Sequence, residues 1–254
     1  MKVKLMAHLV AGYPTQKASL EAARALARGG ATYLEVQFPF SDPSADGPAI
    51  QAACTQALAA GFKVSKGWEL VSTLRQEFPN LPVFVMSYAS IVIARGVKAF
   101  VDEAARQGVG LIIPDLIPGA DEGLFEAGRL AGVPIVPVIV PTVSKERLQD
   151  LLALKPEWVY TAIRTGITGV HTTLTPDLEF FLAGLRDQTK VLAGFGIDSP
   201  EQVRSLASFA HAVVVGSAFV RSIAKAWNED IPEERRLEEL SSSLTKQATS
   251  LSEV

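Results

Sequence analysis

Cysteine is almost absent from this chain. Cys54 is the only one among 254 residues, which excludes a disulfide framework within the chain. The chain also lacks an excess of positive charge, because it has 24 basic and 27 acidic residues. A net charge of −3 gives no indication of nucleic-acid binding. No apolar run reaches the length of a membrane span, and the start does not read as a signal peptide. We therefore expect a cytoplasmic protein that binds neither nucleic acid nor membranes, with Cys54 as a small buried hydrophobe.

Histidine is equally scarce. The chain contains His8, His171 and His211, which are too scattered in the sequence to predict a zinc site, so we expect no metal. Hydrophobic residues, by contrast, make up 48% of the chain, which is enough for one large core.

Short runs rich in Val, Ile and Leu recur along the whole chain and alternate with helical patterns, as in residues 19–29, 97–108 and 202–210. Eight near-continuous apolar runs of this kind are typical of parallel strands buried on both faces. They predict a (β/α)8 TIM barrel of one domain over residues 1–254. An open doubly wound sheet is the alternative, but its usual glycine-rich turn is missing after the first run. The runs cover residues 3–10, 32–37, 82–87, 110–114, 134–140, 158–163, 190–193 and 211–215.

Helix boundaries support this alternation. Ser199, followed by Pro200 and Gln202, has the pattern of an N-cap with a capping-box partner. Gly29 and Gly108 stand where helix C-caps are expected. In the last segment, 229–254, leucines recur at helical spacing, which predicts an amphipathic helix packed on the barrel, with a frayed tail as the alternative.

An acid inside the second apolar run is the first candidate for chemistry. The alternation in Tyr33-Leu-Glu-Val-Gln37 puts Glu35 on the polar-marked face of a strand, and Asp42 and Asp46 follow on a proline-rich loop. An edge strand with a solvated face is the plainer explanation. Active sites of TIM barrels lie at the C-terminal ends of the strands, where these residues fall. A carboxyl among apolar side chains retains its proton while one on a wetter loop stays ionised, so Glu35 and Asp46 suit a general acid and base pair.

The stretch PFSDPSADGPAIQ, with Glu35 four residues before its first proline, closely resembles the signature of the tryptophan synthase alpha subunit family. The resemblance implies cleavage of indole-3-glycerol phosphate to indole and glyceraldehyde 3-phosphate by acid-base retro-aldol chemistry, without a cofactor. In that family the residue at Glu35 shuttles protons, and the residue at Asp46 accepts a hydrogen bond from the indole N–H. It also implies a beta subunit as partner in an alpha2-beta2 complex.

Glycines mark a candidate phosphate site. Gly194 and Gly196 follow the seventh run, and Gly216 with Ser217 follows the eighth and opens a helix. Phosphate-binding barrels use backbone N–H groups at these two loops. Ordinary βα turns are the alternative for each pair alone. Both places match the family, as does Gly169.

The family resemblance also assigns a pocket, a lid and a docking surface. Tyr88, Tyr160, Phe195 and His8 correspond to positions around the indole. The polar segment with Arg164 and Thr168 resembles a mobile lid, and glycines beside it suit a hinge. Residues on the loop after Glu35 are expected to form an exposed rim that contacts the beta subunit, namely Pro39, Phe40, Asp42 and Pro43.

Two residues depart from the family pattern. Gln37 stands where glycine is usual, and its amide is expected to narrow the mouth or re-aim the loop. His8 replaces a usual aromatic residue. A weakly catalytic subunit that mainly activates a beta subunit is therefore a second hypothesis. A different phosphate-binding isomerase or aldolase is a third, because barrels host many chemistries.

Overall fold

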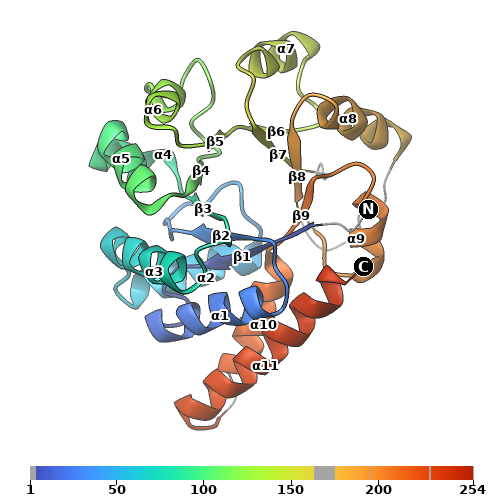
Figure 1. Ribbon diagram of the computed structural model, residues 1–254. Helices are drawn as coiled ribbons and strands as arrows, with labels where there is room; N and C mark the ends of the chain where they lie inside the picture. Colours follow the sequence, from blue (N-terminus) through green and yellow to red (C-terminus); the bar gives the residue numbers. More distant parts are fainter. Residues whose placement is uncertain (1–3, 163–174, 195, 229, 254) are drawn as a thin grey trace.

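The computed structural model describes residues 4–162, 175–194, 196–228 and 230–253. Its strands form one parallel sheet, in the order β5-β4-β3-β2-β1-β9-β8-β7-β6, that curls into a nearly closed barrel with helices outside it (Figure 1). The prediction of a TIM barrel is confirmed. The strands are β1 (Lys4–Val10), β2 (Tyr33–Gln37), β3 (Val83–Met86), β4 (Gly110–Ile112), β5 (Ile135–Val136), β6 (Val138–Ile139), β7 (Trp158–Ala162), β8 (Lys190–Gly194) and β9 (Ala212–Val215).

The fifth apolar run appears as two short strands because Pro137 divides it. Proline has no N–H for the ladder, so regular pairing stops at this residue. β5 pairs with β4 on one side of the break, and β6 pairs with β7 on the other. The carbonyl of Pro137 still accepts a hydrogen bond from the Tyr160 N–H at 2.9 Å. One segment thus joins the two halves of the sheet and completes the eight predicted strand positions.

The helices cover the outside of the barrel, and their ends follow local sequence chemistry. Ser199 forms the predicted capping box with Gln202, and Gly29 and Gly108 are C-caps, with Gly108 in the left-handed conformation. The helices are α1 (Gln16–Arg28), α2 (Pro48–Ala59), α3 (Val64–Glu77), α4 (Ala89–Arg95), α5 (Val97–Gln107), α6 (Leu124–Ala131), α7 (Lys145–Ala153), α8 (Pro176–Arg186), α9 (Pro200–Leu206), α10 (Ser217–Trp227) and α11 (Glu233–Ser252).

Aromatic side chains plug the N-terminal end of the barrel interior. The Trp158 ring lies edge-to-face with Tyr33 and Phe84, at centroid distances of 5.4 and 5.5 Å. Gly110 makes room for this cluster, because a Cβ there would lie 2.6 Å from the Phe84 ring. Tyr33 also contacts His211 across 2.9 Å, which places that histidine at the plugged end. The space left inside the barrel is therefore at the other end, where the strands finish.

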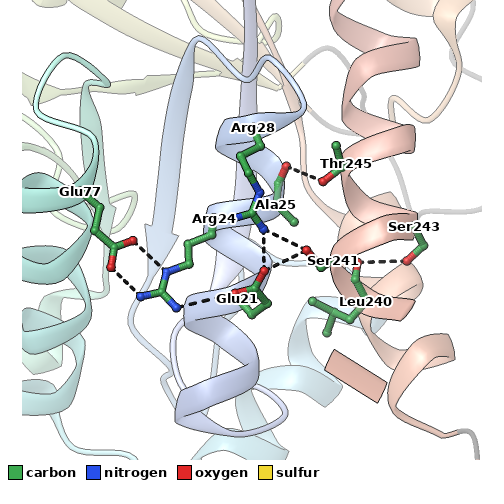
Figure 2. Close-up of polar contacts among 9 residues, drawn as sticks. All are labelled: Glu21, Arg24, Ala25, Arg28, Glu77, Leu240, Ser241, Ser243 and Thr245. Carbon is green, nitrogen blue, oxygen red and sulfur yellow. Dashed lines mark hydrogen bonds and ion pairs between the residues drawn. The ribbon is translucent and has the colours of Figure 1, made fainter. Parts of the chain in front are cut away.

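The C-terminal helix α11 packs against α1 and α10. Its own Leu240, Leu244 and Leu251 are buried, and the hydroxyl of its Thr245 donates to the Ala25 carbonyl at 3.2 Å. Figure 2 shows the polar edge of this contact, where Arg28 donates to both Glu21 of α1 and Ser241 of α11.

Arg24, one turn before Arg28, makes two hydrogen bonds to Glu77 of α3, so α1 is held between α3 and α11 (Figure 2).

Among the helices that the structure describes, none has both the length and the apolar character needed to cross a membrane.

Candidate active site

A cavity of about 400 Å³ opens at the C-terminal ends of the strands. It is the place where barrels of this architecture carry their active sites. Strand ends of β1, β2 and β7 and the loops that begin α2, α9 and α10 all contribute to its wall. Seven of the residues selected from the sequence meet here: His8, Glu35, Asp46, Tyr160, Gly196, Gly216 and Ser217.

Glu35 projects from β2 into this cavity. β2 lies between β1 and β3, and all five of its residues are buried, so the alternative of a solvated edge strand is wrong. Glu35 itself is 3% exposed. Its Oε2 lies 3.4 Å from Nδ1 of His8, an ion-pair distance between two buried groups.

His8 stands beside Glu35 on the neighbouring strand. Burial acts most strongly on the pKa of His8 and lowers it, but the negative charges of Glu35 and Asp46 and the contact with the Glu35 carboxyl outweigh burial. The result is a His8 pKa above its usual 6.5. The family resemblance placed His8 in the indole pocket; the structure places it in the cavity wall in direct contact with the Glu35 carboxyl.

Asp46 is held by two donors on one of its oxygens. Its Oδ2 accepts hydrogen bonds from Gln37 Nε2 at 2.6 Å and from the Tyr88 hydroxyl at 2.8 Å. The Tyr88 hydroxyl in turn accepts from the Ala45 N–H at 3.2 Å. Two donors on Oδ2 leave Oδ1 as the oxygen of Asp46 to which a ligand can donate.

The surroundings of Asp46 differ from the wetter loop that we expected. Burial raises the pKa of its carboxyl, more than His8, Tyr88 and Gln37 lower it. The proline-rich loop folds back over the strand ends, so Asp46 is half-buried and lines the cavity. Both members of the predicted acid-base pair are therefore in an environment that excludes much of the solvent.

Gln37 has a role other than narrowing the mouth. Its side chain is fully buried and does not line the cavity. Besides Asp46, its amide contacts the Cys54 sulfur at 3.5 Å, which ties the end of β2 to α2. Cys54 is buried as predicted, and burial raises the pKa of its thiol to about 12.

The candidate phosphate end of the cavity is built at the start of α10. Gly216 caps this helix, Ser217 begins it, and both line the cavity with Gly196. The first N–H groups of a helix lack acceptors within the helix and favour an anion. Arg221, one turn further along α10, also lines the cavity, and its guanidinium lies 3.6 Å from the Asp198 carboxyl.

Arg221 was not among the residues predicted from the sequence, although a basic residue four positions after Ser217 lies on the same helix face and could have indicated it. Gly194 was predicted to belong to the phosphate loop. Gly194 instead ends β8 and gives room to Tyr160, because a Cβ there would lie 2.3 Å from the Tyr160 hydroxyl oxygen. Apolar strand and loop residues complete the wall, among them Ile50, Met86, Ile112, Val138 and Val214.

The prediction that the loop after Glu35 forms an exposed rim is wrong in part. Pro39 and Pro43 are buried, and Phe40 is half-buried because it stacks on Tyr88 at a centroid distance of 5.2 Å. Asp42 is exposed and accepts a hydrogen bond from Ser41. The prolines and Phe40 hold the loop on the barrel, and its exposed residues are Ser41, Asp42 and Ser44.

Four predicted site residues lie outside the described residues, namely Arg164, Thr168, Gly169 and Phe195. Within the described ranges, no group of three or more His, Cys, Asp or Glu side chains is arranged to hold a metal ion. This cavity combines two carboxyls, an imidazole, the N–H groups of a helix start and an arginine, and Gly216 at the helix start faces the His8 ring. Such a site can move protons on an apolar, planar ligand that carries an anionic tail.

Comparisons with known proteins agree with this geometry. A family described as "Tryptophan synthase alpha chain" matches residues 1–249. The chain is similar to the tryptophan synthase alpha chain of Helicobacter hepaticus, with 40% identity over 88% of this chain and 87% of the relative. It is also similar to the tryptophan synthase alpha chain of Halorhodospira halophila, with 38% identity over 92% of this chain and 88% of the relative.

Solved structures give the same result. A tryptophan synthase structure from Mycobacterium tuberculosis superposes with a TM-score of 0.85 at 29% identity, covering 100% of this chain and 93% of that one. The tryptophan synthase complex from Pyrococcus furiosus gives a TM-score of 0.84 at 29% identity, with complete coverage of both chains.

Proposed function

This chain belongs to the tryptophan synthase alpha chain family, and from that premise we propose that Glu35 and Asp46 carry out its reaction. The chain is a lyase of tryptophan biosynthesis that cleaves indole-3-glycerol phosphate to indole and glyceraldehyde 3-phosphate. The observation that supports the residue assignment is the meeting of both carboxyls in one cavity that is also lined by a helix start suited to a phosphate. As an enzyme of this biosynthesis, it is proposed to act in the cytoplasm.

Glu35 moves the protons in this proposal. Its protonated carboxyl donates to C3 of the indole ring, which makes the ring electron-poor. The carboxylate then accepts the proton of the neighbouring glycerol hydroxyl as the carbon–carbon bond breaks. The electron pair of that bond returns to the ring, so indole and an aldehyde form and Glu35 regains its proton. General acid-base groups of this kind contribute about 10²- to 10⁴-fold to a rate.

Asp46 stabilises the ring while it carries positive charge. Oδ2 is held by Gln37 and Tyr88, so Oδ1 is the oxygen proposed to accept the indole N–H. A carboxylate near a developing positive charge lowers the barrier only if it is already in place, and the two donors supply that preorganisation. The apolar wall, which includes Met86 and Ile112, and Tyr160 are proposed to contact the flat ring.

The phosphate is proposed to bind at Gly196, Gly216 and Ser217, with Arg221 as a cation at the same end. Backbone N–H groups of a helix start suit phosphate oxygens, and glycine allows their close approach. Gly169 is proposed to join this site, and Phe195 the indole pocket. Arg164 and Thr168 are proposed to act as a lid that closes on Asp46.

The chain acts with a beta subunit, as the complexes among its structural relatives indicate. We propose an alpha2-beta2 assembly in which the loop with Asp42 contacts the partner. In this assembly the loop keeps a fixed shape for its partner, because Pro39, Phe40 and Pro43 pack on the barrel and are not themselves proposed to contact the beta subunit. Docking is proposed to favour the closed site and so to speed cleavage.

The test of the proposed function is product formation by the purified chain. Indole-3-glycerol phosphate is incubated with the chain alone, and indole and glyceraldehyde 3-phosphate are quantified by chromatography over time. We expect the two products in equal amounts, because one bond breaks per turnover. If the substrate is consumed without indole, or if no product forms with or without a beta subunit, the proposed function is wrong.

A further inference from the structure

His8 and Glu35 form a buried ionisable pair at the centre of the cavity. They stand opposite each other in the parallel ladder of β1 and β2, so both side chains point into the barrel. Each residue is 3% exposed, and His8 Nδ1 lies 3.4 Å from Glu35 Oε2. In the described part of the chain, neither His8 Nε2 nor Glu35 Oε2 has a hydrogen bond, so the 3.4 Å contact joins the two groups as an ion pair. A buried charge is costly unless it has a partner, so each group depends on the other for its charge state.

The other titratable groups around His8 support this pairing. Asp46, on the loop over the strand ends, adds a second negative charge that acts on the imidazole. Tyr160 of β7 lines the same cavity, and burial raises its pKa well above the usual 10, so this phenol stays neutral. Asp198 and Arg221 also line the cavity and contact each other, and neither is among the charges that shift the His8 pKa. Among the described residues, the charges that act on His8 are therefore negative, and they favour its protonated form.

We propose that His8 and Glu35 share one proton, and that His8 is a positioning residue that keeps this proton beside Glu35 through neutral pH. The inference rests on the proposed function, because it adds a proton store to the acid that cleaves the substrate. His8 acts through Glu35 and need not touch the substrate.

The shared proton balances over one turnover. It passes from His8 Nδ1 to Glu35 Oε2, and Glu35 delivers a proton to the indole ring. As the carbon–carbon bond breaks, Glu35 takes the proton of the glycerol hydroxyl, and the pair returns to its starting state. No oxidant, reductant or net proton is needed.

A pH dependence follows from the two groups. The imidazole starts from a pKa of about 6.5, and a lone carboxyl starts from about 4.3. Since the pKa of His8 is raised further, the pair retains its last proton below that raised value and loses it as the pH climbs through it. Without His8, this raised value is lost to the pair, because no imidazole remains to hold the last proton. The alkaline limb of kcat/KM should then move to lower pH.

The experiment is a pH profile of kcat/KM for indole release, between pH 5.5 and 9, in the wild type and three variants. His8→Phe removes the imidazole, and His8→Gln retains a polar group that does not titrate. Met6→Leu is the matched control, because Met6 is fully buried two residues earlier on the same strand. We expect both His8 variants to move the alkaline limb to lower pH and the control to leave it in place. For a limb displaced by one pH unit, kcat/KM falls about tenfold above the limb and little below it.

A role of His8 in packing alone would lower kcat/KM by the same factor at every pH. An alkaline limb that stays in place in both His8 variants would overturn the proposal, even if their rates fall.

The pair is also tested without substrate, which separates its failure from that of the proposed function. Histidine-labelled protein is titrated by NMR, and the His8 signal is assigned as the one lost in His8→Phe. We expect a midpoint above 6.5 that falls in Glu35→Gln, because the paired charge is gone. A His8 midpoint at or below 6.5, or one that Glu35→Gln leaves unchanged, overturns the pair. Absence of cleavage together with a normal His8 titration would instead reject the proposed function.

Discussion

Replacing Gln37 with leucine removes one of the two donors on the Asp46 carboxylate and leaves every residue that lines the cavity unchanged. Leucine has a similar size, so the packing between β2 and α2 is largely retained. The Gln37 hydrogen bond lowers the Asp46 pKa, so its loss should raise a pKa that burial has already raised. Because Asp46 is needed in its ionised form, the acid limb of kcat/KM should move to higher pH.

The size of this effect depends on the strength of the lost hydrogen bond. A hydrogen bond to a charged group contributes about 1.5–3 kcal/mol, and one pKa unit corresponds to about 1.4 kcal/mol. Because Asp46 retains the Tyr88 hydroxyl as a donor, we expect the acid limb to move by about one pH unit, at the low end of this range. At a pH below the limb, kcat/KM should fall about tenfold, while at about pH 8 the variant should approach the wild-type value.

A measurement of stability in urea distinguishes this change in the Asp46 pKa from damage to the fold. The side-chain oxygen of Gln37, Oε1, is buried without a hydrogen bond from the described residues. This cost to the free energy of unfolding offsets part of the stability that the side-chain N–H group contributes through its hydrogen bond to Asp46. Gln37→Leu should therefore change the urea midpoint little. Gln188→Leu, at an exposed glutamine beyond α8, is the matched control and should change neither the midpoint nor the profile. An acid limb that stays in place in a folded Gln37→Leu protein would refute the role of Gln37.

Three further predictions concern the phosphate end, the terminal helix and the partner. Gly216→Val should raise KM for indole-3-glycerol phosphate more than KM for the dephosphorylated analogue, since the new side chain stands at the helix start proposed for the phosphate, whereas its contact with the His8 ring, 3.4 Å from the new Cβ, affects both ligands alike; Gly184→Val is the control, and equal losses for both ligands would contradict the site. Leu244→Ala should lower the free energy of unfolding by about 2–5 kcal/mol in urea, whereas Leu130→Ala on exposed α6 should change it little; a small effect at Leu244 would mean that α11 contributes little to the fold. Adding a beta subunit should raise the cleavage rate and the complex mass together, and Asp42→Ala should weaken both; no complex at micromolar concentration would refute the partnership.

The period of side chains along strands made much of the site predictable. Alternation around Glu35 put it on the polar-marked face of a strand, the strand order put it at the active-site end, and the order of strands and loops put Gly216 at a helix start, because all three depend on local geometry or fold class. The contact between Gln37 and Asp46 depends on how the intervening loop folds back, and the spacing of the two residues does not reveal it.

The same limit explains the errors on the loop. Proline and phenylalanine at a loop tip suggested exposure, but Pro39, Phe40 and Pro43 pack on the barrel and on Tyr88. The prediction that Asp46 lies in wetter surroundings was wrong because those apolar residues hold the loop over the cavity. Gly194 was assigned to the phosphate, but the space that it leaves is taken by Tyr160, a side chain of another strand. Contacts between distant segments set all of these features.

Glu35→Gln compared with Glu126→Gln is the measurement on which the assignment depends. Both changes replace a carboxyl with an amide, one in the cavity and one on the exposed face of α6. We predict that Glu35→Gln lowers kcat for indole release by about 10²- to 10⁴-fold while glycerol 3-phosphate still binds, and that Glu126→Gln retains the wild-type rate. A folded Glu35→Gln protein that retains more than about a tenth of the wild-type kcat would contradict the role of Glu35.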